Sequence, residues 1–220
     1  MAVCLYAICG GEVQPPPGAG LHGKPLRMIR SGDLSAMVSD SPEASRREVG
    51  EAELWQHESA VEELMAAHDV LPVRFGEVLD SDAAVQEMLA SRCDEFESAL
   101  ERVAGACELS VRAAWPQETP ISEPRTGTSY LGARADAESR AEALARRLQS
   151  SLAPFSRGSR LRRVFQPRPS LAGAYLVARN MVSAFMAEIE RLDREMSETT
   201  LVCTGPWPPY SFVQGDGAEQ

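Results

Sequence analysis

The order of the elements predicted after residue 106 constrains the fold of this chain most strongly. Apolar and polar residues alternate from Cys107 to Trp115, as is typical of a half-buried strand. The patterns that follow predict a helix over 128–152, strands over 159–166 and 171–177, a helix over 180–192 and a strand over 199–203. This βαββαβ order is that of the ferredoxin-like fold, a four-stranded sheet with two helices on one face.

The first half of the chain predicts a second, smaller unit that also mixes strands and helices. Strands are expected over residues 3–9, 26–30 and 34–39, with a tight hairpin at Ser31-Gly32-Asp33. A helix is predicted to open at Ser41-Pro42-Glu43 and to carry His57 on its apolar face. Pro72 lacks a backbone donor, so residues 70–73 are read as an edge strand or a crossover segment. A further helix is predicted to begin at Ser81-Asp82 and to end near Gly105. The predicted class is therefore α+β, with a ferredoxin-like C-terminal domain.

Charge divides the chain at about the same place. Residues 41–110 carry 17 acidic and 5 basic side chains, whereas residues 111–195 carry 9 acidic and 14 basic ones. Three prolines between residues 116 and 124 indicate an extended, hinge-like connection between two units. We therefore expect an N-terminal domain over residues 1–105, a C-terminal domain over 106–213 and a flexible tail over 214–220.

Composition excludes several classes of protein. The net charge of −10 argues against general binding to nucleic acids or anionic membranes, because both require a basic face. The apolar opening segment lacks a basic flank and is too short to cross a bilayer, so a soluble intracellular protein is expected. The five cysteines lie in or beside apolar segments without metal-ligand spacing, which predicts free thiols and no metal site.

Sequence patterns also argue against an enzyme. The nucleotide-binding, nucleophile-elbow and zinc-protease motifs are missing, and no cofactor is predicted. Glu53 and His57 stand four residues apart on a predicted helix, where a surface ion pair or a packing histidine is the more frequent explanation than a catalytic pair. The glutamates around them fit a solvated helix face better than a cation site, because no turn brings their oxygens together.

The densest basic cluster follows the second predicted helix. It comprises Arg157, Arg160, Arg162, Arg163 and Arg168. On a ferredoxin-like sheet such a cluster suggests RNA binding, but only Phe165 and Tyr175 could stack on bases. The other interpretations are contacts to the acidic first half and a charged edge that blocks stray strand pairing.

Two segments are unusual for a general α+β protein. In Val70–Val78, Arg74 lies between Val73 and Phe75, so we expect a buried guanidinium tied to carbonyls or an acid. In Thr204–Val213, three prolines stiffen a strip that presents Trp207, Tyr210 and Phe212. We expect this strip either to pack back on the folded body or to dock a partner; if Trp207 is largely buried, its truncation to alanine should cost roughly 2–4 kcal/mol.

These segments resemble the gas vesicle synthesis protein L/F family. The shared strings run along nearly the whole chain: Leu5-Tyr6-Ala7-Ile8, Leu34-Ser35-Ala36-Met37-Val38-Ser39, the helical His57, Leu71-Pro72-Val73-Arg74-Phe75-Gly76, Gly127-Thr128-Ser129-Tyr130-Leu131, Ala174-Tyr175-Leu176-Val177 and Gly205-Pro206-Trp207-Pro208-Pro209-Tyr210-Ser211-Phe212.

The resemblance implies a non-enzymatic accessory protein for the assembly of gas vesicles, located at the vesicle or in the cytoplasm. Its implied partners are the main shell protein, other accessory gas vesicle proteins, or both, which it would bind during nucleation and growth; retention as a minor shell component is left open. The candidate structural or partner-binding residues are Arg74, Phe75, Trp207, Tyr210, Phe212, Arg160, Arg162 and Arg163. The alternative function is a ferredoxin-like regulatory module that binds RNA or a small molecule.

Overall fold

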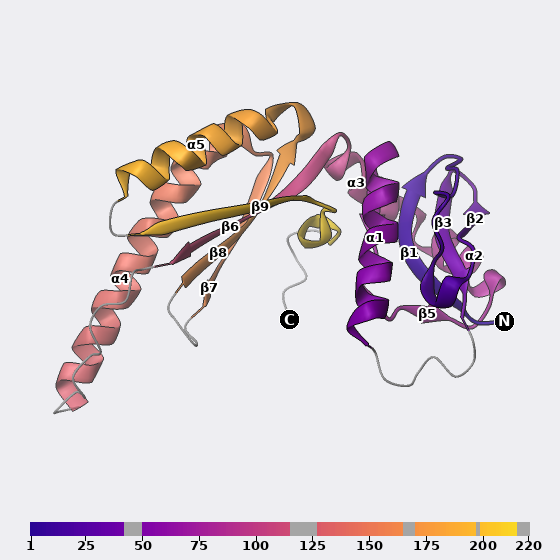
Figure 1. The fold of residues 1–220 in the computed structure, drawn as a ribbon, viewed down its shortest axis with the longest axis horizontal. Coiled ribbons are helices and arrows are strands. Elements are labelled where there is room, and N and C mark those ends of the chain that lie inside the picture. The colour runs from indigo at the N-terminus through magenta and orange to yellow at the C-terminus, as the bar shows by residue number, and fades with distance from the viewer. Residues whose placement is uncertain (42–49, 115–126, 165–169, 197–198, 215–220) are drawn as a thin grey trace. The chain divides into compact units, whose positions relative to one another are not determined.

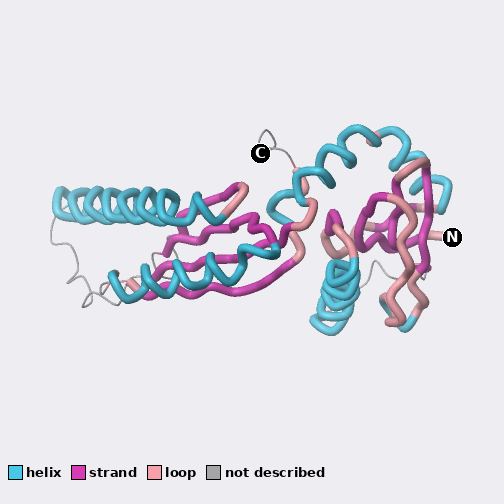
Figure 2. The backbone as a smooth tube through the Cα atoms, turned by 90° about the horizontal axis from the view of Figure 1, so that it is seen from above, coloured by secondary structure: helices cyan, strands magenta, loops and turns pink. Residues whose placement is uncertain are grey.

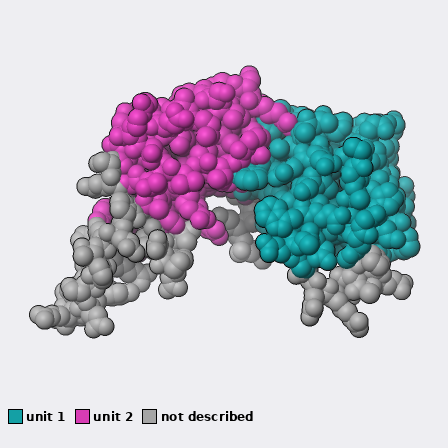
Figure 3. Space-filling model, viewed as in Figure 1, with its two compact units in different colours: residues 1–106, 207–220 teal, residues 107–206 magenta. Residues whose placement is uncertain are grey.

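The chain forms two compact units that each combine a sheet with helices (Figure 1). A computed structural model describes residues 1–41, 50–114, 127–164, 170–196 and 199–214, without the side chains of residues 127–137, 163 and 164. Unit 1 comprises Met1–Ala106 together with Trp207–Gln220, and unit 2 comprises Cys107–Pro206 (Figure 3). The fold class is mixed α+β, as the sequence predicts.

The sheet of unit 1 is built around the buried first strand. Strand β1 (Val3–Gly10) pairs antiparallel with β3 (Leu34–Asp40), which forms a hairpin with β2 (Arg27–Ser31). On its other side β1 pairs with the short strands β4 (Val70–Pro72) and β5 (Val78–Leu79). The hairpin turn and the edge position of β4 agree with the sequence prediction, whereas β5 is not predicted.

Three helices pack on this sheet. Helix α1 (Glu51–Ala67) buries one face, which includes His57 and Leu64. Helix α2 (Asp82–Ser91) begins at Ser81, whose side chain accepts a hydrogen bond from the backbone of Ala84. Helix α3 (Cys93–Val103) follows directly, so the single helix predicted from Ser81 to Gly105 is in fact two. The helix opening predicted at residues 41–43 is not tested, because residues 42–49 lie outside the described residues.

Unit 2 has the element order that the sequence predicts. It runs β6 (Ala106–Ala114), α4 (Gly127–Leu152), β7 (Gly158–Val164), β8 (Ser170–Ala178), α5 (Val182–Glu195) and β9 (Thr200–Trp207). The strands form one sheet in the order β7-β8-β6-β9, with β7 and β8 antiparallel (Figure 1). Figure 2 shows the helices and strands of the chain in separate colours. Strands β7 and β9 are therefore the two edges of this sheet.

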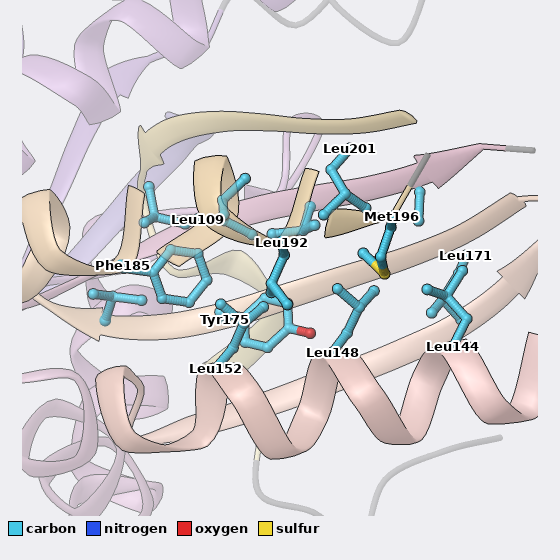
Figure 4. Packing of buried hydrophobic residues seen from close by; sticks show 14 residues of the cluster. Leu109, Leu144, Leu148, Leu152, Leu171, Tyr175, Phe185, Leu192, Met196 and Leu201 are labelled. Carbon is cyan, nitrogen blue, oxygen red and sulfur yellow. The ribbon is translucent and has the colours of Figure 1, made fainter. Parts of the chain in front are cut away.

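The core of unit 2 lies between one face of the sheet and its two helices (Figure 4). Leu144, Leu148 and Leu152 of α4 point toward the strands, where they meet Tyr175 of β8. Helix α5 contributes Phe185, Ile189 and Leu192 to the same cluster. Burial of large apolar side chains from both helices on one sheet face drives this packing, at about 1.5–3 kcal/mol for each fully buried side chain.

The division between the units differs from the expected domain limits at the C-terminus. The sequence analysis assigns residues 207–213 to the C-terminal domain, whereas Trp207 and the residues after it belong to unit 1. The proline-rich segment 116–124 lies outside the described residues, but it falls between β6 and α4 and so within unit 2. It does not connect the two units, because the chain passes from unit 1 to unit 2 at Ala106 and Cys107.

Candidate functional site

The C-terminal strip is held on unit 1 by its own residues. After β9 the chain forms a short 3-10 helix, η4 (Tyr210–Phe212), whose Phe212 side chain is only 5% exposed. The hydroxyl of Tyr210 donates a hydrogen bond of 3.2 Å to a carboxylate oxygen of Glu58 on α1. The guanidinium of Arg102 on α3 donates to the carbonyl oxygen of Phe212 at 2.9 Å. Two helices of unit 1 thus fix the end of the chain.

This contact also changes the acidity of both groups. Burial raises the pKa of the Glu58 carboxyl, and the hydrogen bond from Tyr210 opposes part of that change. Burial, followed by the charge of Glu58, raises the pKa of the Tyr210 phenol well above its usual range. The phenol therefore stays protonated and remains a donor at all moderate pH values.

Two of the candidate side chains do not have the environment that the sequence suggests. Trp207 is 41% exposed, whereas Pro208, Pro209 and Phe212 of the strip are buried and Tyr210 is half-buried. Arg74 is exposed, and the expectation of a buried guanidinium is wrong. A turn explains the difference: the amide of Glu77 donates to the carbonyl of Arg74 at 3.4 Å, and Gly76 adopts a positive φ of 94°. This turn lets Arg74 leave the apolar run while Phe75 stays half-buried.

Phe75 belongs to a buried aromatic cluster around His57. The imidazole of His57 stacks on Tyr6 with ring centroids 4.9 Å apart and meets the Phe75 ring edge-on at 5.5 Å. Its Nε2 donates to the carbonyl oxygen of Val73 at 2.9 Å, while Nδ1 is buried without a hydrogen-bond partner among the described residues. Burial lowers the pKa of His57, so the ring is neutral in the fold.

A hydroxyl network that sequence reasoning missed extends this cluster. The hydroxyl of Tyr6 lies 2.8 Å from Ser39 Oγ and accepts a hydrogen bond of 2.7 Å from the amide of Leu21. A Cβ on Gly20 would lie 2.5 Å from the same hydroxyl, so the loop there depends on glycine. Tyr6 and Ser39 stand on strands that only the folded sheet brings together, and neither carried a local signal.

An open groove lies at the C-terminal end of α1 in unit 1. Its volume is about 620 Å³, and its apolar lining comes from Pro16, Pro17, Leu64, Ala66 and Ala67. The lining also includes the polar residues Gln14, Glu63 and His68. This groove was not predicted from the sequence. Its lining comes from a proline-containing loop and from the end of a helix, which are far apart in sequence.

Helix α1 also exposes an aromatic side chain on its outer face. Trp55 is 63% exposed and Leu54 is 41% exposed, which is unusual for large apolar residues. The indole nitrogen of Trp55 donates to a carboxylate oxygen of Glu51 at 3.4 Å. The apolar residues therefore lie among the glutamates of an acidic helix.

The basic candidates occupy the edge strand of unit 2. Arg160 and Arg162 pair in register with Ala174 and Ala172 of β8, which places them on the sheet face opposite the helices. Arg163 lies on the same strand, and its side chain is outside the described residues. Tyr175 is fully buried in the core, so it is not available to stack on a base, and Phe165 lies outside the described residues. Nothing in the described part of the sheet favours the RNA-binding alternative.

The geometry also bears on catalysis and metal binding. Glu53 accepts a hydrogen bond from the amide of Gly50 at 3.0 Å and caps α1, so it does not orient His57. Among the described residues, no cluster of three or more His, Cys, Asp or Glu side chains could hold a metal ion. All five cysteines are free thiols in the structure, and burial raises the pKa of Cys9 to about 12 and that of Cys203 to about 11. Within the described part of the chain, the helices are too short or too polar to cross a membrane.

Comparison with known proteins gives one consistent family. A family model described as gas vesicle synthesis protein GvpL/GvpF matches residues 2–214. Gas vesicle protein L of Streptomyces sp. (strain CB03234) is 31% identical over 233 residues, which cover 90% of this chain and 87% of the relative. Gas vesicle protein F2 of Halobacterium salinarum is 29% identical over 191 residues, which cover 85% of this chain and 80% of the relative.

Solved structures show the same fold. The crystal structure of gas vesicle protein GvpF from Anabaena sp. PCC7120 aligns with a TM-score of 0.84 at 18% identity, over 100% of this chain and 98% of that one. GvpF from Microcystis aeruginosa aligns with a TM-score of 0.80 at 17% identity, over 97% and 99% of the two chains. At these identities the likeness concerns the fold alone.

Proposed function

Because this chain belongs to the gas vesicle synthesis protein GvpL/GvpF family, we propose that it is a non-enzymatic accessory protein that binds the main gas vesicle shell protein, other accessory gas vesicle proteins, or both. It acts during nucleation and growth of the vesicle and is retained there as a minor component. A role in binding rather than catalysis agrees with the glutamate-histidine pair, whose members cap a helix and pack in the core.

The observation that carries the proposal is the apolar groove at the end of α1. A protein that holds an apolar subunit needs an exposed apolar surface that the subunit covers on binding. Pro16 and Pro17 line the groove with a backbone that has little conformational entropy to lose, and the small side chains of Ala66 and Ala67 in its lining allow close approach. The groove thus fits an apolar segment of the shell protein.

A substitution in the groove tests this assignment. Ala67→Glu places a charge on the apolar wall at an exposed position, so binding should fall at least about tenfold while the melting temperature stays unchanged. Ala90→Glu makes the same change at an exposed alanine of α2, away from the groove, and serves as the matched control. Binding is measured by co-purification with the shell protein and by gas vesicle yield in complemented cells. Unchanged binding by Ala67→Glu would exclude the groove.

We also propose that unit 2 is a ferredoxin-like domain. The element order β6-α4-β7-β8-α5-β9 and the strand order β7-β8-β6-β9 support a ferredoxin-like domain whose helices cover one sheet face. The proposed place of the protein is the gas vesicle, which agrees with the family to which it belongs. Light microscopy of a fluorescent fusion together with a labelled shell protein checks this place directly.

A further inference from the structure

The outer face of α1 is acidic and aromatic at once. The helix contains five glutamates and no lysine or arginine. Its exposed Glu51, Trp55 and Glu62 lie on one side, because residues three or four apart in sequence share a helix face. His57, Ala60 and Leu64 occupy the opposite, buried side. Tryptophan is enriched among the residues that contribute most to binding at protein interfaces, and the carboxylates beside Trp55 would favour a basic partner surface.

Unit 2 carries a surface of the complementary kind. The sheet face opposite α4 and α5 presents small side chains, among them Ala172 and Ala174 of β8, which are half-buried. Arg162 of β7 and Arg112 of β6 are exposed and alternate along their strands with residues that face the core. On β9 the exposed Val202 adds apolar area to this face. This face thus carries small apolar side chains on β8 and exposed arginines on β6 and β7, with the buried carboxyl of Glu108 on β6 beside them.

We propose that α1 of one molecule docks on this sheet face of a second copy of the same chain. Trp55 and Leu54 then cover the small residues of β8, and Glu51 and Glu62 pair with Arg112 and Arg162. Charge complementarity supports this occupant: α1 lacks basic side chains, while Arg160 and Arg162 of β7 and Arg112 of β6 lie on the sheet face opposite the helices. An α+β sheet ordinarily buries apolar residues by packing against helices, and a helix from a neighbour supplies that cover.

The dimensions of the two surfaces are compatible. Glu51 and Glu62 are separated by roughly 16 Å along the helix axis, at 1.5 Å per residue. Arg112 and Arg162 stand on strands with β8 between them, which gives about 10 Å across two strand spacings before any offset along the strands. Long arginine side chains can span the difference. The contact joins two different surfaces, so the molecules associate head-to-tail. Repetition of this contact produces open chains or closed rings of molecules.

Paired charge reversals test the proposal without any other gas vesicle protein. One variant carries Glu51→Arg and Glu62→Arg, and the other carries Arg112→Glu and Arg162→Glu. Wild type should form concentration-dependent oligomers in sedimentation velocity, and each variant alone should be monomeric. A one-to-one mixture of the two variants should associate again, because each contact between the two variants joins an α1 and a sheet face of opposite charge. Trp55→Ala should weaken the wild-type association by about tenfold or more.

Two charge reversals away from both surfaces serve as controls. Glu101→Arg on α3 and Arg194→Glu on α5 reverse exposed charges away from both surfaces, and they should associate as wild type does. Circular dichroism shows whether each variant folds. A wild type that stays monomeric over a roughly hundred-fold concentration range, or a mixture that stays monomeric, overturns the proposal. The groove proposed to bind the shell protein is tested separately by Ala67→Glu. Failure of the self-association and failure of shell-protein binding can therefore be distinguished.

Discussion

The hydroxyl of Tyr210 donates a hydrogen bond to the carboxylate of Glu58, a residue 152 positions earlier in the chain. Tyr210 follows the last strand of unit 2, whereas Glu58 lies in the middle of α1. The bond closes the chain onto unit 1, in combination with the burial of Phe212 and the contact from Arg102.

Removal of the Tyr210 hydroxyl tests the strength of this contact. Tyr210→Phe should lower the free energy of unfolding by about 1–2 kcal/mol, because a half-buried carboxylate loses its donor. Urea denaturation measures the change, and a double-mutant cycle with Glu58→Ala, which removes the acceptor, isolates the coupling. A coupling energy of zero would show that the two groups do not interact in solution.

The two aromatic ends of the strip should differ in their effect on stability. Phe212→Ala should cost about 3–5 kcal/mol, because the side chain is almost fully buried. Trp207→Ala should cost less than about 2 kcal/mol, because 41% of the residue is exposed. Thermal unfolding of the two variants compares them. Equal losses would mean that Trp207 is more deeply packed in solution than in the structure.

Acid should weaken unit 1 through His57. Burial lowers the pKa of this ring in the folded state, so the neutral ring contributes fully to stability above its unfolded pKa of about 6.5. That contribution is lost as the pH falls through the folded-state pKa. His57→Phe keeps an aromatic ring between Tyr6 and Phe75 but cannot be protonated. The fall in unfolding free energy from about pH 8 to about pH 5 should therefore be smaller in this variant, and an equal fall would assign the acid sensitivity to other groups.

The loop before η1 (Leu21–Gly23) should tolerate no side chain at Gly20. Gly20→Ala should destabilise the protein by about 1–3 kcal/mol, since the new Cβ would lie 2.5 Å from the Tyr6 hydroxyl and 2.9 Å from Ser39 Cβ. Gly10→Ala is the matched control, because its Cβ would only touch Leu100 at 3.8 Å. Chemical denaturation of both variants checks the difference, and equal stabilities would contradict the crowding.

Local signals explain which parts of the fold were predictable. Ser81 caps α2 as its sequence context predicts, because an N-cap needs only residues three positions apart. The break between α2 and α3 was missed, since Val85, Leu89 and Phe96 continue one apolar stripe through it. At the break, Arg92 stacks over the Phe96 ring and bonds to Glu95, and neither contact alters the periodicity of the sequence.

The sequence predicted that the C-terminal strip could pack on the folded body, but it did not predict the burial or the contacts of each candidate residue. Phe212 and Tyr210 are anchored as an apolar strip requires, but the helices that receive them lie far away in sequence. Arg74 could not be placed from its apolar neighbours, because the turn at Gly76 ends the alternation there. The groove beside α1 combines a proline loop with a helix end, and only the folded chain brings them together.

The return of the chain to unit 1 at Trp207 has a consequence for synthesis on the ribosome. Most of unit 1 emerges first, yet Phe212, a buried side chain of the same unit, is made only after the whole of unit 2. Unit 2 is contiguous in sequence and can fold as soon as Pro206 has left the exit tunnel. The unit that is translated first is therefore completed last, and until then the receiving surface of α1 and α3 stays open to other contacts.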